Sequence, residues 1–329
     1  MANMNDVAKL AKVSRGTVSN YINGVKVNDE SAKRIEKAIK DLNYVPNQAA
    51  RMLKKNASDT IALILPTIWN PFFAELTNYI QQELKKNNMK MLLCASQDDY
   101  NRELDYVQMA KEEKVKGIIT ISYSNIEPYI TSGLPIVSIE RYFNQTVPFV
   151  TSDNFQGAYL ATQALHQRGV KKPLFILREI SSNLGLFERK NGFIDYCNYA
   201  KLDYEVYQDT GDSYNFQERI KAFLHEKYEN GCTYDGIFAA TDRYAEYVLN
   251  AFSDLKWKIP DDVQLVGFDG AKSYENQTLT ISTIVQDIEG IAKRSVEELL
   301  NFDKDKPIQS KHILPVRFVP LKTTKKLEK

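Results

Sequence analysis

DVAKLAKVSRGTVSNYIN, at residues 6–23, contains two short helical patterns that meet at a tight turn over residues 12–14. The apolar face of the first pattern is formed by Val7, Ala8, Leu10 and Ala11. Ser14 is a candidate N-cap of the second pattern, because its hydroxyl can accept a free backbone N–H of the next turn. The stretch therefore predicts a helix, a turn and a second helix near the start of the chain.

The second of these helices has small and polar side chains outside its apolar face. Val18 and Ile22 lie four residues apart and therefore share one face. The remaining positions are occupied by Arg15, Gly16, Thr17, Ser19 and Asn20. A helix that reads base edges in the DNA major groove needs such short, hydrogen-bonding side chains. Ordinary core packing of two amphipathic helices is the alternative interpretation.

Two further features favour DNA binding. A third helical pattern follows, with a candidate cap at Asn28 and apolar residues at Ala32, Ile35, Ala38, Ile39 and Leu42. The first 57 residues carry 11 Lys and Arg against 5 Asp and Glu, a net charge of +6, whereas the rest of the chain is at −5. A polyanion should therefore be attracted to the N-terminal segment and not to the remainder.

Two segments resemble a known family. Residues 6–23, followed by LNYVPNQAARML at residues 42–53, resemble the head and hinge of the lactose/galactose repressor family of bacterial transcription regulators. The resemblance implies an all-α helix-turn-helix DNA-binding domain over residues 1–46 and a hinge helix and linker over 47–58. It implies contacts to double-stranded operator DNA by Asn5, Ser14, Arg15, Gly16, Thr17, Ser19, Asn20, Asn23, Asn47, Ala50, Arg51, Leu53 and Lys54.

The predicted hinge helix is very short. Pro46 ends the third helix, and Asn47 is a candidate cap for a helix over residues 48–54, which is under two turns. Because so short a helix is unstable alone in water, we expect it to form only on DNA, as in the family. The resemblance implies that Leu53 is inserted between base pairs from the minor groove, which kinks the duplex.

Composition and motifs argue against several other classes. The length of 329 residues suits about two domains, and 43% hydrophobic with 26% charged residues is typical of a soluble globular protein. There is no apolar run of about 18 residues and no secretory signal pattern, so we expect a cytoplasmic protein without a membrane partner. Cysteines occur only at Cys94, Cys197 and Cys232, and histidines only at His166, His225 and His312. These residues are far apart in the sequence, and there is no phosphate-binding or dinucleotide-binding motif. The sequence therefore predicts no enzyme, no catalytic residue, no metal and no cofactor.

From residue 60 onward, apolar runs alternate with helical patterns. Strands are predicted at 61–65, 89–95, 117–121, 135–139, 149–153, 173–177, 204–208, 236–241, 263–268 and 281–285. Helices are predicted at 72–87, 101–114, 154–168, 188–199, 215–230, 243–256 and 287–301. This alternation predicts parallel sheets with helices on both faces, and ten strands suit two sheets better than one.

Three further segments extend the resemblance. They are ERKNGF at 188–193, VGFD at 266–269 and TLTISTIVQD at 278–287, which are similar to the family's ligand core. That core resembles periplasmic sugar-binding proteins. The resemblance therefore implies an α/β effector-binding and dimerisation core over residues 59–329, made of two doubly wound parallel-sheet subdomains.

Each subdomain of this core is expected to contain two stretches of chain. The N-subdomain is predicted at about 59–157 and 287–314. The C-subdomain is predicted at about 158–286 and 315–329.

Candidate ligand residues follow the predicted strands, because open α/β sheets bind ligands at the carboxyl ends of their strands. They are Trp69, Phe72, Phe73, Asp153, Arg189, Asp242, Asp269 and Gln286. Aromatic rings suit the C–H faces of a sugar, and the polar groups suit its hydroxyls. Arg189 and Asp269 match positions that contact effectors across the family. The alternatives are helix capping for Asp153, Asp242 and Asp269, and ordinary core packing for one of the two phenylalanines.

The residues and the family resemblance together predict a sugar-responsive repressor that a sugar releases from a palindromic operator. The resemblance alone suggests sucrose or a related sugar as the effector. A regulator whose DNA binding a small molecule or partner protein strengthens is the nearest alternative. A transport sugar-binding protein and a sugar kinase are weaker alternatives, since the former does not need a basic head and the latter needs a phosphate loop. The final residues, LKTTKKLEK, lack the leucine heptads of tetrameric family members, which favours a homodimer.

Overall fold

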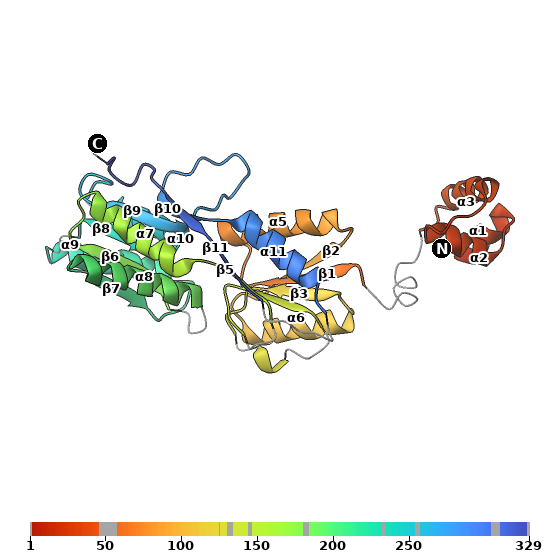
Figure 1. The fold of residues 1–329 in the computed structure, drawn as a ribbon, viewed down its shortest axis with the longest axis horizontal. Coiled ribbons are helices and arrows are strands. Elements are labelled where there is room, and N and C mark those ends of the chain that lie inside the picture. The colour runs from red at the N-terminus through yellow and green to blue at the C-terminus, as the bar shows by residue number, and fades with distance from the viewer. Residues whose placement is uncertain are drawn as a thin grey trace. The chain divides into compact units, whose positions relative to one another are not determined.

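The structure is a computed structural model that describes residues 2–45, 58–124, 126–129, 134–143, 147–179, 184–231, 234–253, 257–303 and 310–327. The chain divides into two compact units, Met1–Ser58 and Asp59–Lys329 (Figure 1). The predicted hinge contacts lie outside the described residues; they are Asn47, Ala50, Arg51, Leu53 and Lys54. In the described part of the chain, no helix is long and apolar enough to cross a membrane.

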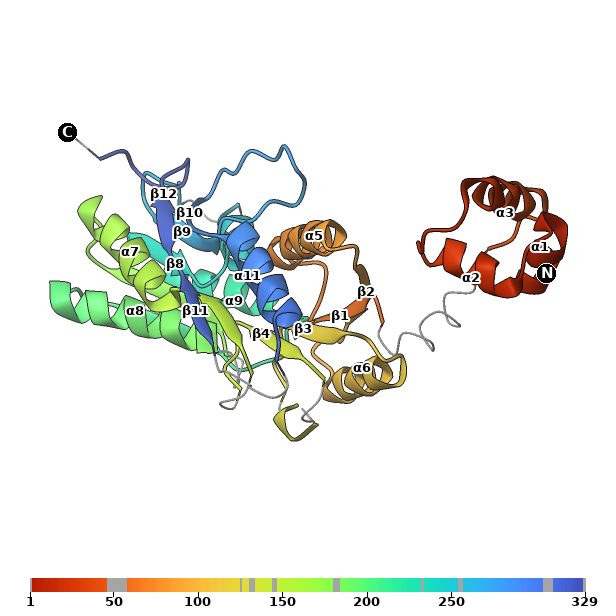
Figure 2. The same ribbon diagram turned by 45° about the vertical axis from the view of Figure 1, so that its right-hand side comes forward.

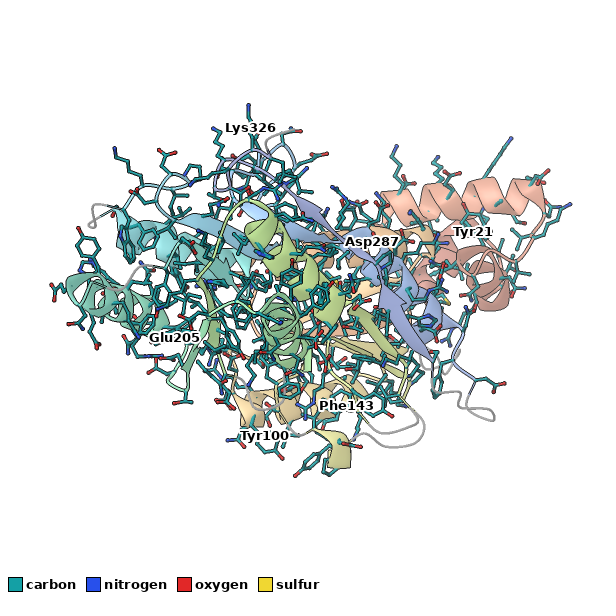
Figure 3. All side chains as sticks on the ribbon, turned by 60° about the vertical axis from the view of Figure 1, so that its left-hand side comes forward. Tyr21, Tyr100, Phe143, Glu205, Asp287 and Lys326 are labelled. Atoms are coloured by element: carbon teal, nitrogen blue, oxygen red, sulfur yellow. The ribbon has the colours of Figure 1, made fainter. Side chains whose placement is uncertain are left out.

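In the first unit, residues 2–45 form a bundle of three helices. They are α1 (Met4–Ala11), α2 (Arg15–Ile22) and α3 (Asp29–Asp41). Their common core buries Val7, Ala8, Ala11, Val18, Ile35, Ala38 and Tyr44, with Tyr21 (Figure 3) partly buried against it. The predicted helix, turn and second helix are therefore confirmed.

Both predicted N-caps of this bundle are present. The Ser14 hydroxyl accepts the backbone N–H of Thr17 at 3.1 Å. The Asn28 side chain accepts the backbone N–H of Glu30 at 2.8 Å. Each bond satisfies a donor that the first turn of its helix leaves without an intrahelical partner.

The predicted apolar face of α1 is wrong at Leu10, which is 50% exposed. Successive residues of a helix are rotated by about 100°. Leu10 therefore lies at the edge of the side on which Ala11 and Val7 pack into the core, and it stays exposed there.

The second unit contains two six-stranded sheets. In spatial order, the first consists of β11 (Lys311–Leu314), β5 (Phe149–Ser152), β4 (Ile136–Ile139), β3 (Gly117–Thr120), β1 (Thr60–Leu65) and β2 (Lys90–Ala95). The second consists of β12 (Val316–Val319), β10 (Ser282–Gln286), β9 (Gln264–Asp269), β8 (Gly236–Ala239), β6 (Pro173–Arg178) and β7 (Glu205–Asp209). All neighbouring strands are parallel except β10 and β12. The predicted fold class is confirmed.

Helices cover both faces of each sheet (Figure 2). The first sheet packs against α5 (Pro71–Lys86) and α11 (Ile288–Leu300) on one face and α6 (Tyr100–Glu112) on the other. The second sheet packs against α7 (Asn154–Gln167) and α8 (Leu184–Ala200) on one face, and α9 (Phe216–Glu229) and α10 (Asp242–Phe252) on the other. A 3-10 turn, η1, spans Glu127–Tyr129.

The apolar runs form strands because both faces of each sheet are buried. In β1, Ile61, Leu63 and Leu65 belong to the cluster with α5 and α11. Ala62 and Ile64 belong to the opposite cluster, with α6. Since successive side chains of a strand point to opposite faces, a strand between two helix layers must be apolar at every position.

The chain passes between the sheets at three places. It crosses after β5 at Asp153, after β10 at Asp287, and between β11 and β12 at Pro315. Two of the crossings are joined, because the Asp153 N–H donates to the Leu314 carbonyl at 2.9 Å. The strands β11 and β12 were not predicted from sequence, because both are partly exposed and lack a continuous apolar run.

Two glycines let α7 pack closely, one against the second sheet and the other against α8. A Cβ at Gly157 would lie 2.6 Å from the Phe268 ring, and one at Gly192 would overlap the Phe155 carbonyl of α7. The missing side chains therefore let α8 approach α7, and α7 approach the sheet.

Gly192→Ala should therefore force α8 away from α7 and lower the free energy of unfolding of the second unit by about 1–3 kcal/mol. Urea unfolding of the full chain, followed by circular dichroism, measures the loss. Asn198→Ala, at an exposed position of the same helix, is the control and should leave the transition unchanged. Equal transitions for the two variants would show that α7 and α8 have room for a methyl group.

Candidate functional site

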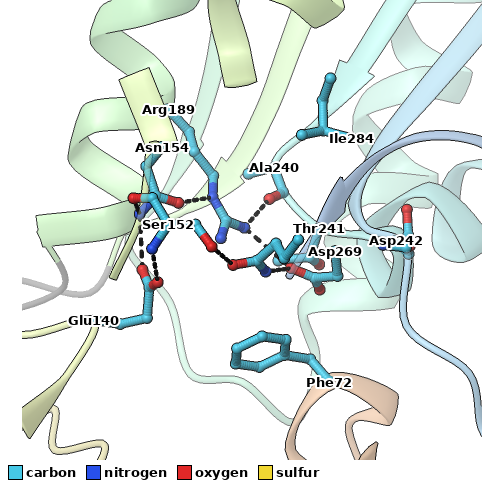
Figure 4. Close-up of polar contacts among 12 residues, drawn as sticks. Phe72, Glu140, Ser152, Asn154, Arg189, Ala240, Thr241, Asp242, Asp269 and Ile284 are labelled. Atoms are coloured by element: carbon cyan, nitrogen blue, oxygen red, sulfur yellow. Dashed lines mark hydrogen bonds and ion pairs between the residues drawn. The ribbon is translucent and has the colours of Figure 1, made fainter. Parts of the chain in front are cut away.

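The buried guanidinium of Arg189, on α8, lies at the carboxyl ends of the second sheet's strands (Figure 4). Its Nε donates to Asn154 Oδ1 at 2.8 Å and its Nη1 to the Ala240 carbonyl at 2.7 Å. Nη1 also lies 3.4 Å from Asp269 Oδ1. The guanidinium carbon is 3.6 Å from the centroid of the Phe268 ring, so one face of the cation is covered by an aromatic ring.

These contacts extend into the first sheet. The Asn154 amide donates to Glu140 Oε2 at 2.8 Å, and the Glu140 carboxylate follows β4. On the other side, the Ser152 hydroxyl of β5 donates to Gln286 Oε1 at 2.7 Å. The Gln286 amide then donates to Asp269 Oδ1 at 2.8 Å. The Arg189 network, defined by these six side chains, therefore joins both sheets through hydrogen bonds between buried groups.

The two buried aspartates of the second sheet serve different local roles. Asp269 ends β9 in the left-handed backbone region, with φ of 128°, and its carboxylate belongs to the Arg189 network. Asp242 begins α10 and accepts the Gly270 N–H at 2.7 Å and the Thr283 hydroxyl at 2.6 Å. Neither is the N-cap of a helix; Thr241 caps α10 instead.

Burial dominates the electrostatics of these aspartates. It raises the pKa of Asp269, while the nearby Arg189 charge acts in the opposite direction. Burial also raises the pKa of Asp242, against the hydrogen bonds from Thr283 and Gly270. Burial therefore disfavours the charged form of each carboxyl group, and a hydroxyl donor from a ligand would stabilise that charged form.

Two adjoining cavities lie between the sheets. The inner chamber, of about 70 Å³, is lined by Asn70, Phe72, Phe73, Ile121, Tyr123, Glu140, Leu186, Arg189, Thr241, Tyr244 and Asp269. The outer cavity, of about 680 Å³, is lined by Pro66, Thr67, Trp69, Asn70, Phe73, Gln97, Asp98, Tyr123, Arg178, Ser213, Tyr214, Phe216, Gln217, Arg243, Tyr244 and Tyr247. They share Asn70, Phe73, Tyr123 and Tyr244. Aromatic rings and polar groups together are suited to a polyhydroxylated ligand.

Most of the predicted ligand residues lie at these cavities. Arg189 and Asp269 border the inner chamber, and Trp69, 84% exposed, borders the outer cavity. Phe72 and Phe73 both pack into the core of the first sheet as well as lining the inner chamber, so neither is only a core residue. Figure 4 shows the Phe72 ring near the polar groups of the network.

The other three predicted ligand residues have mainly internal partners. Gln286 lies inside the Arg189 network. Asp242 lines a small pocket beside Arg243. Asp153 caps α7 by accepting the Gln156 N–H at 3.0 Å, so the capping alternative applies to it.

Sequence reasoning missed several cavity residues. Glu140 directly follows β4 and Arg178 ends β6, so the rule for strand carboxyl ends was sufficient to find them. Tyr214, in the segment between β7 and α9, had no comparable signal, because nothing in its sequence context marks it as facing a cavity.

The proposed DNA-reading side chains differ in their local contacts. Arg15, Gly16 and Asn20 are exposed on α2, as is Asn5 on α1. The Thr17 hydroxyl lies 2.8 Å from Ser14 Oγ, and the Asn23 amide donates to the Ser19 carbonyl at 2.7 Å. The contact between Ser14 and Thr17 therefore stabilises the start of α2, and the bond from Asn23 to Ser19 stabilises its end.

Comparison with known protein families agrees with both units. The profile described as "Bacterial regulatory proteins, lacI family" matches residues 3–47, and that described as "Periplasmic binding proteins and sugar binding domain of LacI family" matches residues 58–299. The chain belongs to the LacI family. Members of this family are DNA-binding transcriptional regulators and not enzymes, which confirms the family and the regulator class predicted from sequence.

Two relatives of this LacI-family regulator match over nearly the whole chain. The sucrose operon repressor of Pediococcus pentosaceus is 34% identical, over 96% of this chain and 97% of the relative. The ribose operon repressor of Halalkalibacterium halodurans is 32% identical, over 99% of this chain and 98% of the relative.

Solved structures show the same fold. A LacI-type regulator from Alkaliphilus metalliredigens, in complex with D-xylulofuranose, is 27% identical with a TM-score of 0.70, over 82% of this chain and all of that one. The Lac repressor dimer bound to operator and an anti-inducer is 20% identical with a TM-score of 0.83, over 98% and 99% of the two chains. At 20% identity, the match to the Lac repressor shows a shared fold and nothing more.

Arg189→Met should lower the free energy of unfolding of the second unit by about 3–5 kcal/mol, because it leaves buried polar partners without their donor. Thermal unfolding of the full chain with circular dichroism detection measures this. The control is Lys190→Ala, at the next residue, which removes a cation from outside the buried network. A variant at position 189 with parental stability would contradict the structural role of the network.

Proposed function

We propose that this LacI-family regulator represses a carbohydrate-utilisation operon and leaves its palindromic operator when a sugar binds between the two sheets. The observation that supports this most is the Arg189 network beside the aromatic residues of the two cavities. The relatives named as sucrose and ribose operon repressors support a sugar effector, with sucrose or a related sugar as the first candidate.

The DNA-binding part of the proposal assigns residues 1–46 to a head and 47–58 to a hinge. The head uses α2 in the major groove of one half-site, with Arg15, Gly16 and Asn20 at base edges. Its supporting base or phosphate contacts come from Asn5, Ser14, Thr17, Ser19 and Asn23. The hinge uses Asn47, Ala50, Arg51, Leu53 and Lys54, with the leucine inserted into the central minor groove.

A palindromic operator requires two heads, and we therefore propose a cytoplasmic homodimer. β2 is the edge strand of the first sheet and exposes Leu93. A partly apolar edge strand is suited to contact with a second copy.

Sugar binding acts, in this proposal, by changing the angle between the two sheets. Only three crossing segments of chain connect the sheets in the described part of the core. A ligand that contacts both sheets favours one angle over another by its differential affinity for the two states. The altered angle separates the paired hinges and weakens operator binding.

The direct test is fluorescence anisotropy of an operator duplex obtained by in vitro selection with the full chain. We expect one member of a panel containing sucrose, fructose, glucose, ribose and their phosphates to release the DNA. Asp269→Asn should bind DNA like the parent without sugar and fail to respond to it, because the amide replaces one of the two carboxyl oxygens that can accept sugar hydroxyls. Tighter DNA binding on addition of a ligand would replace induction by corepression, and no response to any sugar would contradict the proposal.

Arg15→Ala should weaken operator binding by about 1–3 kcal/mol and relax specificity at one position in each half-site. Binding measured against single-base variants of the operator shows both effects. Lys33→Ala, at an exposed position of α3, is the matched loss of charge and should leave specificity unchanged. Parental specificity in the Arg15 variant would remove this residue from base recognition.

A further inference from the structure

The two cavities between the sheets differ in charge. In the inner chamber, the single cation Arg189 faces the carboxylates of Glu140 and Asp269. The outer cavity has two cations, Arg178 and Arg243, and a single carboxylate on its lining, Asp98. The lining of the outer cavity therefore has more cationic than anionic side chains.

Arg178 has a poor counter-charge. It ends β6 with a side chain 15% exposed, and its nearest carboxylate oxygen, Asp98 Oδ2, is 3.6 Å away on the side of the first sheet. A strong charge-assisted hydrogen bond is about 2.7–2.9 Å long, so this pair is only loosely formed. Burial also raises the pKa of Asp98, which weakens it further as a fixed anion.

Arg243 lies in the first turn of α10 and also lines this cavity. Its Nε donates to the Tyr247 hydroxyl at 2.7 Å. Among the residues that the structure describes, no carboxylate oxygen lies within 4.0 Å of this guanidinium. Arg243 is thus held by a hydroxyl group. Burial raises the pKa of Glu246, and the Arg243 charge acts in the opposite direction.

We propose that the outer cavity binds the phosphate group of a phosphorylated sugar, with Arg178 and Arg243 as its ligands. The sugar ring lies over the inner chamber, where Arg189 and Asp269 bind its hydroxyls. Arginine matches the oxygens of a phosphate through parallel N–H donors, and two arginines at one cavity give both charge and geometry. The outer cavity, of about 680 Å³, has the size of an ordinary ligand pocket.

This inference depends on the proposed sugar response and narrows its ligand from sugars in general to sugar phosphates. It also gives Asp98 a definite role. A phosphate that approaches Arg178 must displace the Asp98 carboxylate, which repels it. Asp98 therefore limits the affinity for the anion, and its removal should have an effect opposite in sign to removal of either arginine.

The test uses the full chain and matched ligand pairs: sucrose with sucrose 6-phosphate, fructose with fructose 6-phosphate, and glucose with glucose 6-phosphate. Inorganic phosphate alone distinguishes recognition of the ester from general anion binding. Binding is followed by the fluorescence of Trp69, one of two tryptophans, which lines the outer cavity. The shift in melting temperature is a second readout that does not depend on this residue.

We expect one phosphorylated sugar to bind at least about tenfold more tightly than its parent sugar, the factor expected for one charge-assisted contact. Arg178→Gln and Arg243→Gln should each lose about tenfold or more in affinity for that phosphate while affinity for the neutral sugar changes little. Asp98→Asn should bind the phosphate more tightly. Arg294→Gln, on the exposed side of α11, is the charge-matched control and should behave as the parent.

Two results would overturn the inference while leaving the sugar response intact: equal binding of both members of every pair, or a phosphate preference that survives in both arginine variants. Inorganic phosphate that binds as tightly as the ester would also overturn it, since the sugar ring would then contribute nothing. If no sugar of either kind shifts the melting temperature or releases the operator, the proposed function fails together with the inference.

Discussion

The buried charge of Arg189 is the constraint on which the core of this protein depends. A guanidinium removed from water must find its partners inside the protein, and here they are the Asn154 amide, the Ala240 carbonyl and the Asp269 carboxylate. Because Asn154 is bonded in turn to Glu140 at the end of β4, the cation fixes groups on both sheets. A ligand that changes the hydrogen bonds of Arg189 therefore also changes the bonds between the two sheets.

The backbone around this cation is shaped to hold it. Gly192 brings α8 close to α7, and this places Arg189, one turn earlier on α8, beside Asn154 at the start of α7. Asp269 has a positive φ at the end of β9, a conformation that non-glycine residues adopt at a cost and that often occurs at functional sites. The close approach at Gly192 and the strained backbone of Asp269 therefore help to position the charged groups of the Arg189 network.

The sequence was sufficient to predict the elements whose burial is uniform. β1, between two helix layers, is a continuous apolar run, and the α2 cap at Ser14 follows from a local hydroxyl. β11 and β12 lacked this signal, since they are partly exposed strands separated only by Pro315. Leu10 was misassigned because a single helical pattern leaves the edge of its apolar face undefined.

Residues of the candidate site were predictable where a suitable side chain follows a strand or lies in a segment that resembles the family. Arg189 and Asp269 were found through segments that resemble the family, and Trp69 through its place after a strand. Glu140 and Arg178 were missed although each lies at the carboxyl end of a strand, whereas Tyr214 lies between β7 and α9, where no local pattern marks it as facing a cavity. The hinge leucine, Leu53, lies outside the described residues, and its role stays a prediction.

In the proposed function, the hydrogen bonds that join the two sheets couple sugar binding to DNA binding. The affinity of the releasing sugar, measured by calorimetry with and without saturating operator, tests it in the parent and in Ser152→Ala, which loses the bond to Gln286. We expect the sugar to bind more weakly to the operator complex than to the free parent protein, and we expect this difference to be smaller in the variant. Equal sugar affinities with and without operator in the parent, or the same difference in both proteins, would contradict it.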